Sequence, residues 1–157
     1  MNKLIILIGI SGSGKSTWTA NYIKKNINTV RINRDSLRLS LVTTLDGYYQ
    51  NKNLQQRERI VNGLEDEIFE QAVSRELDII IDNTNLKQEY INRWIHLSQP
   101  TNYTIEYKFF DVELEEAKYR IKNRDNFSFD GEVSYINKQY ENYILIKDHV
   151  KKHILYR

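Results

Sequence analysis

The pattern of apolar and polar positions divides the chain into strands that alternate with helices. Residues 3–8 and 78–81 are continuous aliphatic runs, which are typical of strands buried on both faces of a parallel sheet. The shorter segment 28–33 also has a strand pattern, and the alternation of apolar and polar residues over 103–112 indicates another strand. The sequence therefore predicts a parallel sheet of about four strands.

Apolar residues at helical spacing occupy the segments between these strands. The predicted helices cover residues 54–75, 86–99, about 113–122 and about 132–147. Pro100 ends the second of them, and the tail 149–157 has no decisive pattern. The positions predicted to form the buried faces of three helices are Ile60, Val61, Leu64, Ile68 and Ala72, then Ile91, Trp94, Ile95 and Ser98, and finally Val133, Ile136, Tyr140, Tyr143 and Ile144.

This order of elements predicts an α/β fold. Strands that alternate with helices form a parallel sheet with helices on both faces, and ligands bind beyond the carboxyl ends of its strands. The chain has 157 residues and no internal repeat, low-complexity tract or linker, which is the size of one domain. We therefore predict a single domain over residues 1–157.

Composition narrows the class of protein further. The chain has no cysteine, so thiolates hold no zinc or iron-sulfur centre, and a reducing, cytoplasmic setting is expected. The aliphatic run at 4–10 is too short to cross a bilayer and leads into glycines, which argues against a membrane span and a signal peptide. A net charge of +2 indicates that any contact with nucleic acid is local.

The strongest chemical signal is GISGSGKS at residues 9–16, which follows a buried strand and precedes a helix. It satisfies the P-loop pattern G-x-x-x-x-G-K-[ST], in which glycines let successive backbone N–H groups point at phosphates. Lys15 is expected to reach the β and γ phosphates, Ser16 to ligate Mg²⁺, and Thr17 to begin the packing of the helix. A plain glycine turn, the alternative, does not require Lys and Ser at these places. The nucleotide-binding residues predicted here are Gly9, Ser11, Gly12, Ser13, Gly14, Lys15, Ser16 and Thr17.

A second element, LDIIIDNTN, contains the aliphatic strand at 78–81. Asp82 follows this strand, where a carboxylate can hold a magnesium-bound water beside the P-loop serine. The alternative is an aspartate that begins a turn into the next helix, for which Thr84 and Asn85 could supply caps.

The octapeptide RINRDSLR lies at the end of another predicted strand. By itself it fits a solvated helix start, because Asn33 and Asp35 are both favoured N-caps. Beside a nucleotide site, Asp35 could orient and deprotonate an acceptor hydroxyl, and Arg38, one helical turn later, could bind an acceptor phosphate. A GTPase would position water instead, so the class implied is a kinase of a small molecule or of nucleic acid.

Other charged residues are given weaker roles. Arg34 could face a bound nucleic-acid strand or be plain surface, and Arg31 is interpreted as a surface residue. The three histidines, His96, His149 and His153, have no partner acids at metal or triad spacing, and we expect no catalytic role for them.

Taken together, GSGKSTW, INRDSLR, IDNTNL and FFDVELEEAKYRIKNR resemble, in order and spacing, the kinase domain of the phage-type 5′-polynucleotide kinases. The resemblance covers residues 3 to about 147. It implies a P-loop kinase fold with a helical lid at about 120–132, ATP or another NTP as phosphoryl donor, and Mg²⁺ as cofactor. The implied reaction is transfer of the γ-phosphate to the 5′-hydroxyl end of DNA or RNA, as in nucleic-acid end repair, in the host cytoplasm if the chain is phage-encoded.

The resemblance also implies roles for individual residues. Asp35 matches the family's general base, and Arg38 matches the arginine that contacts the acceptor phosphate. Arg124 matches the lid arginine that clamps the donor phosphates, with Arg120 one turn earlier. Together with Lys15, these residues form the expected catalytic and nucleotide-binding set. The sequence lacks the aspartate-rich motif of the phosphatase domain found in the best-known phage enzyme, so no removal of 3′ phosphates is expected.

The sequence departs from the family pattern at two places, and two other functions are compatible with it. Val133 and Ser134 stand where the family commonly has Val-Pro, and family members place the acidic residue near Asp82 variably. One alternative is a P-loop kinase of a nucleoside, nucleotide or small metabolite. The other is an ATP-dependent binding or regulatory module. The oligomeric state is left open.

Overall fold

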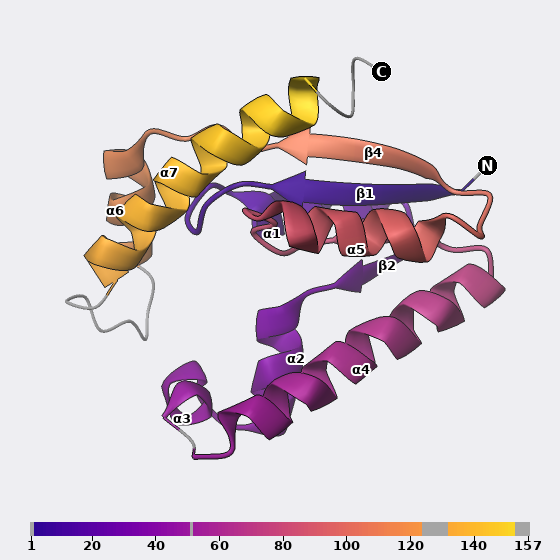
Figure 1. Ribbon diagram of the computed structural model, residues 1–157, viewed down its shortest axis with the longest axis horizontal. Helices are drawn as coiled ribbons and strands as arrows, with labels where there is room; N and C mark the ends of the chain where they lie inside the picture. The colour runs from indigo at the N-terminus through magenta and orange to yellow at the C-terminus, as the bar shows by residue number, and fades with distance from the viewer. Residues whose placement is uncertain (1, 51, 124–131, 153–157) are drawn as a thin grey trace.

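Four parallel strands form one sheet, in the order β2-β3-β1-β4, in the computed structural model (Figure 1). The structure describes residues 2–50, 52–123 and 132–152. All three strand pairings are parallel, so the predicted sheet is confirmed. The strands are β1 (Lys3–Ile8), β2 (Thr29–Ile32), β3 (Asp78–Ile81) and β4 (Thr104–Phe109).

The predicted helices are also found, with ends shifted by a few residues. The helices are α1 (Lys15–Lys25), α2 (Arg34–Leu41), α3 (Leu45–Tyr49), α4 (Leu54–Ser74), α5 (Gln88–Ser98), α6 (Leu114–Lys122) and α7 (Glu132–Val150). The short α3 was not predicted, because five residues are too few for a helical periodicity to show. Most of the lid predicted at about 120–132, namely 124–131, lies outside the described residues. Among the helices that are described, none combines the length and apolar character needed to span a membrane.

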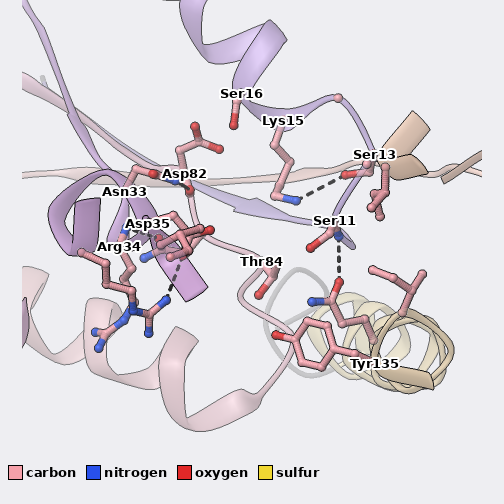
Figure 2. A pocket seen from close by; sticks show the side chains of 18 of the residues that line it. Ser11, Ser13, Lys15, Ser16, Asn33, Arg34, Asp35, Asp82, Thr84 and Tyr135 are labelled. Atoms are coloured by element: carbon pink, nitrogen blue, oxygen red, sulfur yellow. Dashed lines mark hydrogen bonds and ion pairs between the residues drawn. The ribbon is translucent and has the colours of Figure 1, made fainter. Parts of the chain in front are cut away.

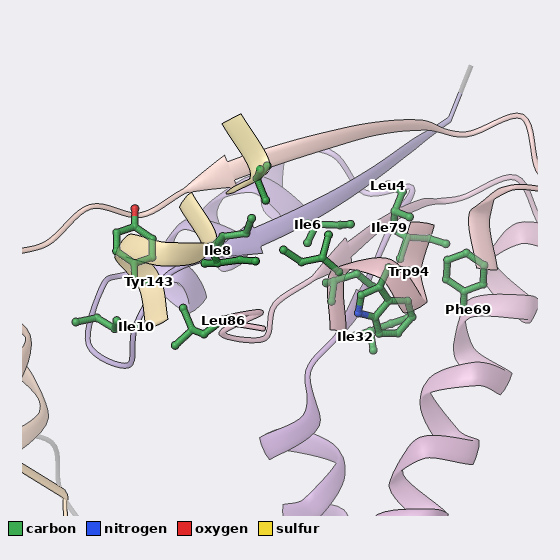
Figure 3. Packing of buried hydrophobic residues seen from close by; sticks show 14 of the residues in the cluster. Leu4, Ile6, Ile8, Ile10, Ile32, Phe69, Ile79, Leu86, Trp94 and Tyr143 are labelled. Carbon is green, nitrogen blue, oxygen red and sulfur yellow. The ribbon is translucent and has the colours of Figure 1, made fainter. Parts of the chain in front are cut away.

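Successive side chains of β1 point to opposite faces of the sheet, and both faces are packed. Leu4, Ile6 and Ile8 point to one face, where they pack with side chains of α4, α5 and α7, including Trp94 (Figure 3). Ile5 and Leu7 point to the other face and pack against Trp18 and its neighbours on α1. Since both faces of β1 are covered, its polar continuation can only emerge at the carboxyl end of the sheet.

For two residues, the prediction that they lie on a buried helix face is wrong. Ile60 on α4 is 51% exposed and Ile144 on α7 is 52% exposed, although their neighbours Val61 and Tyr143 are buried. Adjacent helical positions differ by about 100°, so a helix that buries a narrow stripe leaves one of two adjacent apolar residues in solvent. The side chain of Val133 lies outside the part of the chain that is described.

Asn85 joins the ends of the two central strands instead of capping the next helix. Its side chain is buried, and its Nδ2 donates to the Leu7 carbonyl at 2.7 Å and to the Ile81 carbonyl at 3.4 Å. Its backbone has a φ of 49°, a left-handed conformation that Asn tolerates better than most residues. Lys87 holds the N-cap position of α5, so the capping prediction for Thr84 and Asn85 is wrong.

We predict that Asn85→Ala lowers the free energy of unfolding by about 2–4 kcal/mol, because it leaves buried carbonyls without a donor and puts a Cβ residue at positive φ. Asn85→Gly removes the backbone strain at positive φ and loses only the hydrogen bonds, so its loss of unfolding free energy should be smaller than that of Asn85→Ala. Urea unfolding followed by tryptophan fluorescence measures both. Equal stability of Asn85→Ala and the parent protein would contradict this role.

Candidate active site

The P-loop connects β1 to α1 and needs glycine at two positions. Gly12 has a φ of 77° and Gly14, the N-cap of α1, a φ of 95°, both in the left-handed region that favours glycine. A Cβ on Gly12 would also lie 2.7 Å from the Ala117 carbonyl oxygen of α6. These constraints fix a loop whose N–H groups lead into the positive end of α1, which is a ready anion site.

Lys15 lies in the first turn of α1 and folds over the P-loop. Its Nζ donates to the carbonyls of Gly9 and Ile10, both at 2.8 Å, and to Ser13 Oγ at 3.4 Å (Figure 2). The ammonium group is therefore held inside the loop curve, where phosphates bind in such loops. Thr17 is exposed, so the prediction that it packs the helix is wrong.

Asp82 follows β3 and is paired with Arg31. The carboxylate is buried, and its Oδ2 accepts from Arg31 Nε at 2.7 Å and Nη2 at 2.6 Å. Its Oδ1 is also buried and finds no donor among the described residues. Arg31 Nη2 lies 3.4 Å from Ser16 Oγ, which brings Asp82 close to the first turn of α1. The interpretation of Arg31 as a plain surface residue is therefore wrong.

Two asparagines hold α2 against the end of β3. Asn33 is the N-cap of α2: its side-chain oxygen accepts from the Ser36 N–H at 2.9 Å, and its Nδ2 donates to the Asp82 carbonyl. Asn83 accepts from the Arg34 N–H at 2.9 Å. Of the two candidate caps, Asn33 is thus the one used, which leaves the Asp35 side chain free for another task.

Asp35 projects from the first turn of α2 and pairs with Arg38. Its Oδ1 accepts from Arg38 Nη1 at 2.9 Å, and the Asp35 side chain is 58% exposed. Glu58 of α4 holds the other edge of the same guanidinium, with distances of 2.9 Å to Nε and 3.0 Å to Nη2. Arg38 is therefore fixed between two carboxylates, and among the described residues no hydrogen bond holds the second Asp35 oxygen.

Hydrogen bonds determine the ionisation of Glu58. Burial by itself would raise its pKa, but donors from Arg38, Tyr48 and Arg34 lower the pKa of Glu58 to about 2. Tyr48 is fully buried and donates its hydroxyl to Glu58 at 2.7 Å. Glu58 is thus a permanent anion at neutral pH, and it anchors both α2 and α3 to α4.

A second acid of α4, Glu65, is fully buried and collects donors from three elements. It accepts from Arg34 Nη1 at 2.6 Å, from Arg93 Nη1 at 2.7 Å and from Asn83 Nδ2 at 3.2 Å. Glu58 and Glu65 together hold the Arg34 guanidinium, so this residue of the pocket wall is fixed in place and its charge is compensated.

Helices α6 and α7 contact the other side of the P-loop. Arg120 donates to the Gly12 carbonyl at 3.3 Å and to Glu116 at 2.8 Å. From α7, the buried Gln139 accepts from the Ser11 N–H at 2.7 Å. Arg124 lies outside the described residues, so its predicted place in the lid is not tested by this geometry.

One pocket unites these groups. Its volume is about 570 Å³, within the range of small-ligand sites. It is lined by the P-loop from Ser11 to Ser16, by Asp35 and Arg38 of α2, and by Asp82 (Figure 2). The side chains predicted separately for a phosphoryl donor and for an acceptor thus face the same cavity.

Sequence reasoning missed several residues of this arrangement, among them Glu58, Glu65, Gln139 and Arg31. The first three lie on helices whose patterns only indicated amphipathic packing, and Arg31 lies in a strand. The ion pairs of Glu58 and Arg31 and the hydrogen bond of Gln139 cross between distant segments, and no local motif marks such partners. A buried polar position on an otherwise apolar helix face was the only available signal, and it is weak.

The sheet, the P-loop and the carboxylates at the sheet edge define a P-loop domain of kinase-like fold. The chain belongs to the AAA domain family, whose model matches residues 4–143. A relative from Autographa californica nuclear polyhedrosis virus, named "Putative bifunctional polynucleotide kinase/RNA ligase", is 32% identical over 154 residues. The match covers 93% of this chain and 21% of the relative, so the chain spans about a fifth of the relative's length.

Solved structures agree with this assignment. A chain in the structure of the Pnkp1/Rnl/Hen1 RNA repair complex superposes with a TM-score of 0.79 and 25% identity, over 94% of this chain and 46% of that one. A deoxyadenosine kinase from M. mycoides superposes with a TM-score of 0.60 over 96% of this chain and 86% of that one, but at 18% identity it supports the fold alone. The resemblance to polynucleotide kinases found in the sequence is confirmed by the viral relative and the RNA repair complex.

We predict that Arg31→Ala lowers the free energy of unfolding by about 1–3 kcal/mol, because it leaves the buried Asp82 carboxylate without a positive partner. Arg31→Lys should lose less, since an ammonium keeps the charge without the bidentate geometry. Adding Asp82→Asn to Arg31→Ala should recover part of the loss, because the unpaired charge is then removed. Urea unfolding of the parent, of these three Arg31 and Asp82 variants and of Asp82→Asn alone gives the comparison, and additive losses would argue against the pair.

The low pKa of Glu58 predicts a specific dependence of stability on pH. Its folded pKa of about 2 lies below its ordinary value of 4.5, so its ionisation stabilises the fold fully above pH 4.5. This contribution, about 2 kcal/mol, is lost as the pH falls from 4.5 towards 2. The difference in unfolding free energy between the parent protein and Glu58→Gln should therefore shrink over that interval. A difference that is constant from pH 7 to 2.5 would contradict the assignment.

Proposed function

We propose that the chain transfers the γ-phosphoryl group of ATP, or of another NTP, to the 5′-hydroxyl end of a DNA or RNA strand in nucleic-acid end repair. The observation that carries this proposal is the single pocket in which the P-loop faces Asp35 and Arg38. The names of the viral relative and of the RNA repair complex support nucleic acid as the acceptor. We assign the reaction to the cytoplasm, as the composition indicates.

On the donor side, the P-loop N–H groups and Lys15 bind the phosphates. Lys15 is already held within the curve of the loop, so its charge neutralises the transferring group without a large rearrangement. Arg120 beside Gly12, together with Arg124 of the lid, adds positive charge over the donor. This arrangement accounts for catalysis by positioning and electrostatics, as phosphoryl transfer requires.

On the acceptor side, Asp35 acts as the general base. Its exposed carboxylate accepts the proton of the 5′-hydroxyl as the oxygen attacks the γ-phosphorus. The bond from the γ-phosphorus to the bridging oxygen breaks, and the nucleoside diphosphate leaves. Arg38 keeps the Asp35 carboxylate oriented and binds the phosphate that follows the terminal nucleoside. Arg34 lines the same wall, where Glu58 and Glu65 hold its guanidinium in place.

The residues around Asp82 fit a magnesium ion. The buried Asp82 Oδ1 finds no donor within residues 2–50, 52–123 and 132–152, and the exposed Ser16 hydroxyl is close by. Among the described residues no cluster of three acidic or histidine side chains forms a metal cage. Ser16, with Asp82 through a water molecule, is thus the fitting donor set for Mg²⁺, which keeps most of its waters. When bound, Mg²⁺ would neutralise charge on the donor phosphates.

Transfer from labelled ATP to a 5′-hydroxyl oligonucleotide, in the presence of Mg²⁺, tests this proposal directly. Asp35→Asn should lower the transfer rate by about 10² or more while ATP still binds, because only the base is removed. Lys15→Ala should lose transfer through the donor site. Glu115→Gln, an exposed acid on α6, is the matched control and should keep the parent rate.

The absence of labelled oligonucleotide would contradict the proposal. Label appearing only on a nucleoside, nucleotide or small metabolite would instead favour the alternative kinase class. Hydrolysis of ATP that responds to no acceptor would favour a regulatory module. Asp35→Asn with near-parental transfer would remove Asp35 as the base while leaving the acceptor assignment intact.

A further inference from the structure

Two exposed tyrosines line the pocket that holds Asp35 and Arg38. Tyr49, the last residue of α3, is 49% exposed, and Tyr135 in the first turn of α7 is 61% exposed. Both belong to the lining of the same cavity as the acceptor groups. Their exposure leaves both rings accessible to a ligand in that cavity.

We propose that Tyr49 and Tyr135 form a stacking platform for the first nucleobase of a single-stranded acceptor. This inference rests on the proposed 5′-kinase function and specifies how that site receives its substrate. Stacking on aromatic side chains is the usual way in which proteins hold unpaired bases, and it tolerates any base because every base has a π-face.

Packing fixes the Tyr49 ring in place. It makes an edge-to-face contact with the buried Tyr48 ring, with centroids 5.5 Å apart. The Arg38 guanidinium lies 5.4 Å from the centroid of the Tyr49 ring. A base on this ring would therefore lie next to the arginine that is proposed to bind the adjacent phosphate, as the first nucleotide of a strand requires.

Tyr135 is positioned by the contact between α7 and the P-loop. Gln139 lies four residues after Tyr135, so both are on one face of α7, and Gln139 is hydrogen-bonded to the Ser11 N–H. In Figure 2 the Tyr135 side chain lies on the pocket side of α7, near Ser11 and Thr84. Tyr49 and Tyr135 both line the cavity, so a base that enters it can meet either ring.

The test compares two single-stranded 5′-hydroxyl oligonucleotides that differ only in the first nucleotide, one normal and one with an abasic tetrahydrofuran unit. Equilibrium binding is measured by fluorescence anisotropy of a 3′ label, and phosphorylation by steady-state kinetics. The parent protein should bind the abasic strand about 5- to 150-fold more weakly and show a correspondingly higher KM for it, the range expected for one stacked base.

Substitutions separate stacking from a structural role. Tyr49→Ala and Tyr135→Ala should weaken binding of the normal strand and leave binding of the abasic strand unchanged, while KM for ATP stays the same. Tyr49→Phe and Tyr135→Phe keep the ring and should behave as the parent. The platform would be overturned if the parent bound both strands equally. It would also be overturned if the alanine variants lost the same affinity for both strands, or if they changed only the KM for ATP.

The two readouts also separate this inference from the function on which it rests. Discrimination in binding without any phosphorylation would contradict the kinase function and support the platform. Phosphorylation of both strands at equal KM, with equal binding, would support the function and overturn the platform. Absence of both binding and phosphorylation would overturn both.

Discussion

The burial of β1 and β3 on both faces is the constraint on which the rest of the structure depends. After Lys3 and Asp78 at their first positions, these two strands are aliphatic and cannot carry chemistry along their length, because the aliphatic side chains are packed in the core. All polar function must then emerge where the strands end. Since the strands are parallel, the P-loop, α2 and the segment after β3 leave the sheet at one edge, and their side chains meet there.

Helix α4 fixes the side chains that meet at this edge of the sheet. Its acids Glu58 and Glu65 receive Arg38, Arg34 and Arg93 from two other helices, so each arginine is held in one orientation. Buried ion pairs of this kind add little net stability compared with apolar packing, but they fix geometry. Arg38 illustrates the result, because its guanidinium spans Glu58 of the scaffold and Asp35 of the pocket.

Local pattern was enough to predict the sheet, most helices and the motif residues of the pocket. Aliphatic runs are unambiguous for buried strands, and the P-loop requires Gly, Lys and Ser at set spacing. Ile60, Asn85 and Arg31 could not be assigned correctly, because each depends on what packs against it. For Ile60 the deciding feature is which side of α4 faces the core, for Asn85 it is a buried carbonyl, and for Arg31 it is the carboxylate that follows β3. These are tertiary contacts, and no local sequence pattern marks them.

The close approach of Gly12 to the Ala117 carbonyl has a consequence for motion. With no room for even a methyl group between the loop and α6, the loop cannot move sideways towards that helix. Gln139 holds the loop from α7 at the next residue back. The loop therefore loses little conformational entropy when an anion enters it, and most of the binding free energy is retained as affinity because the ordering has already taken place during folding.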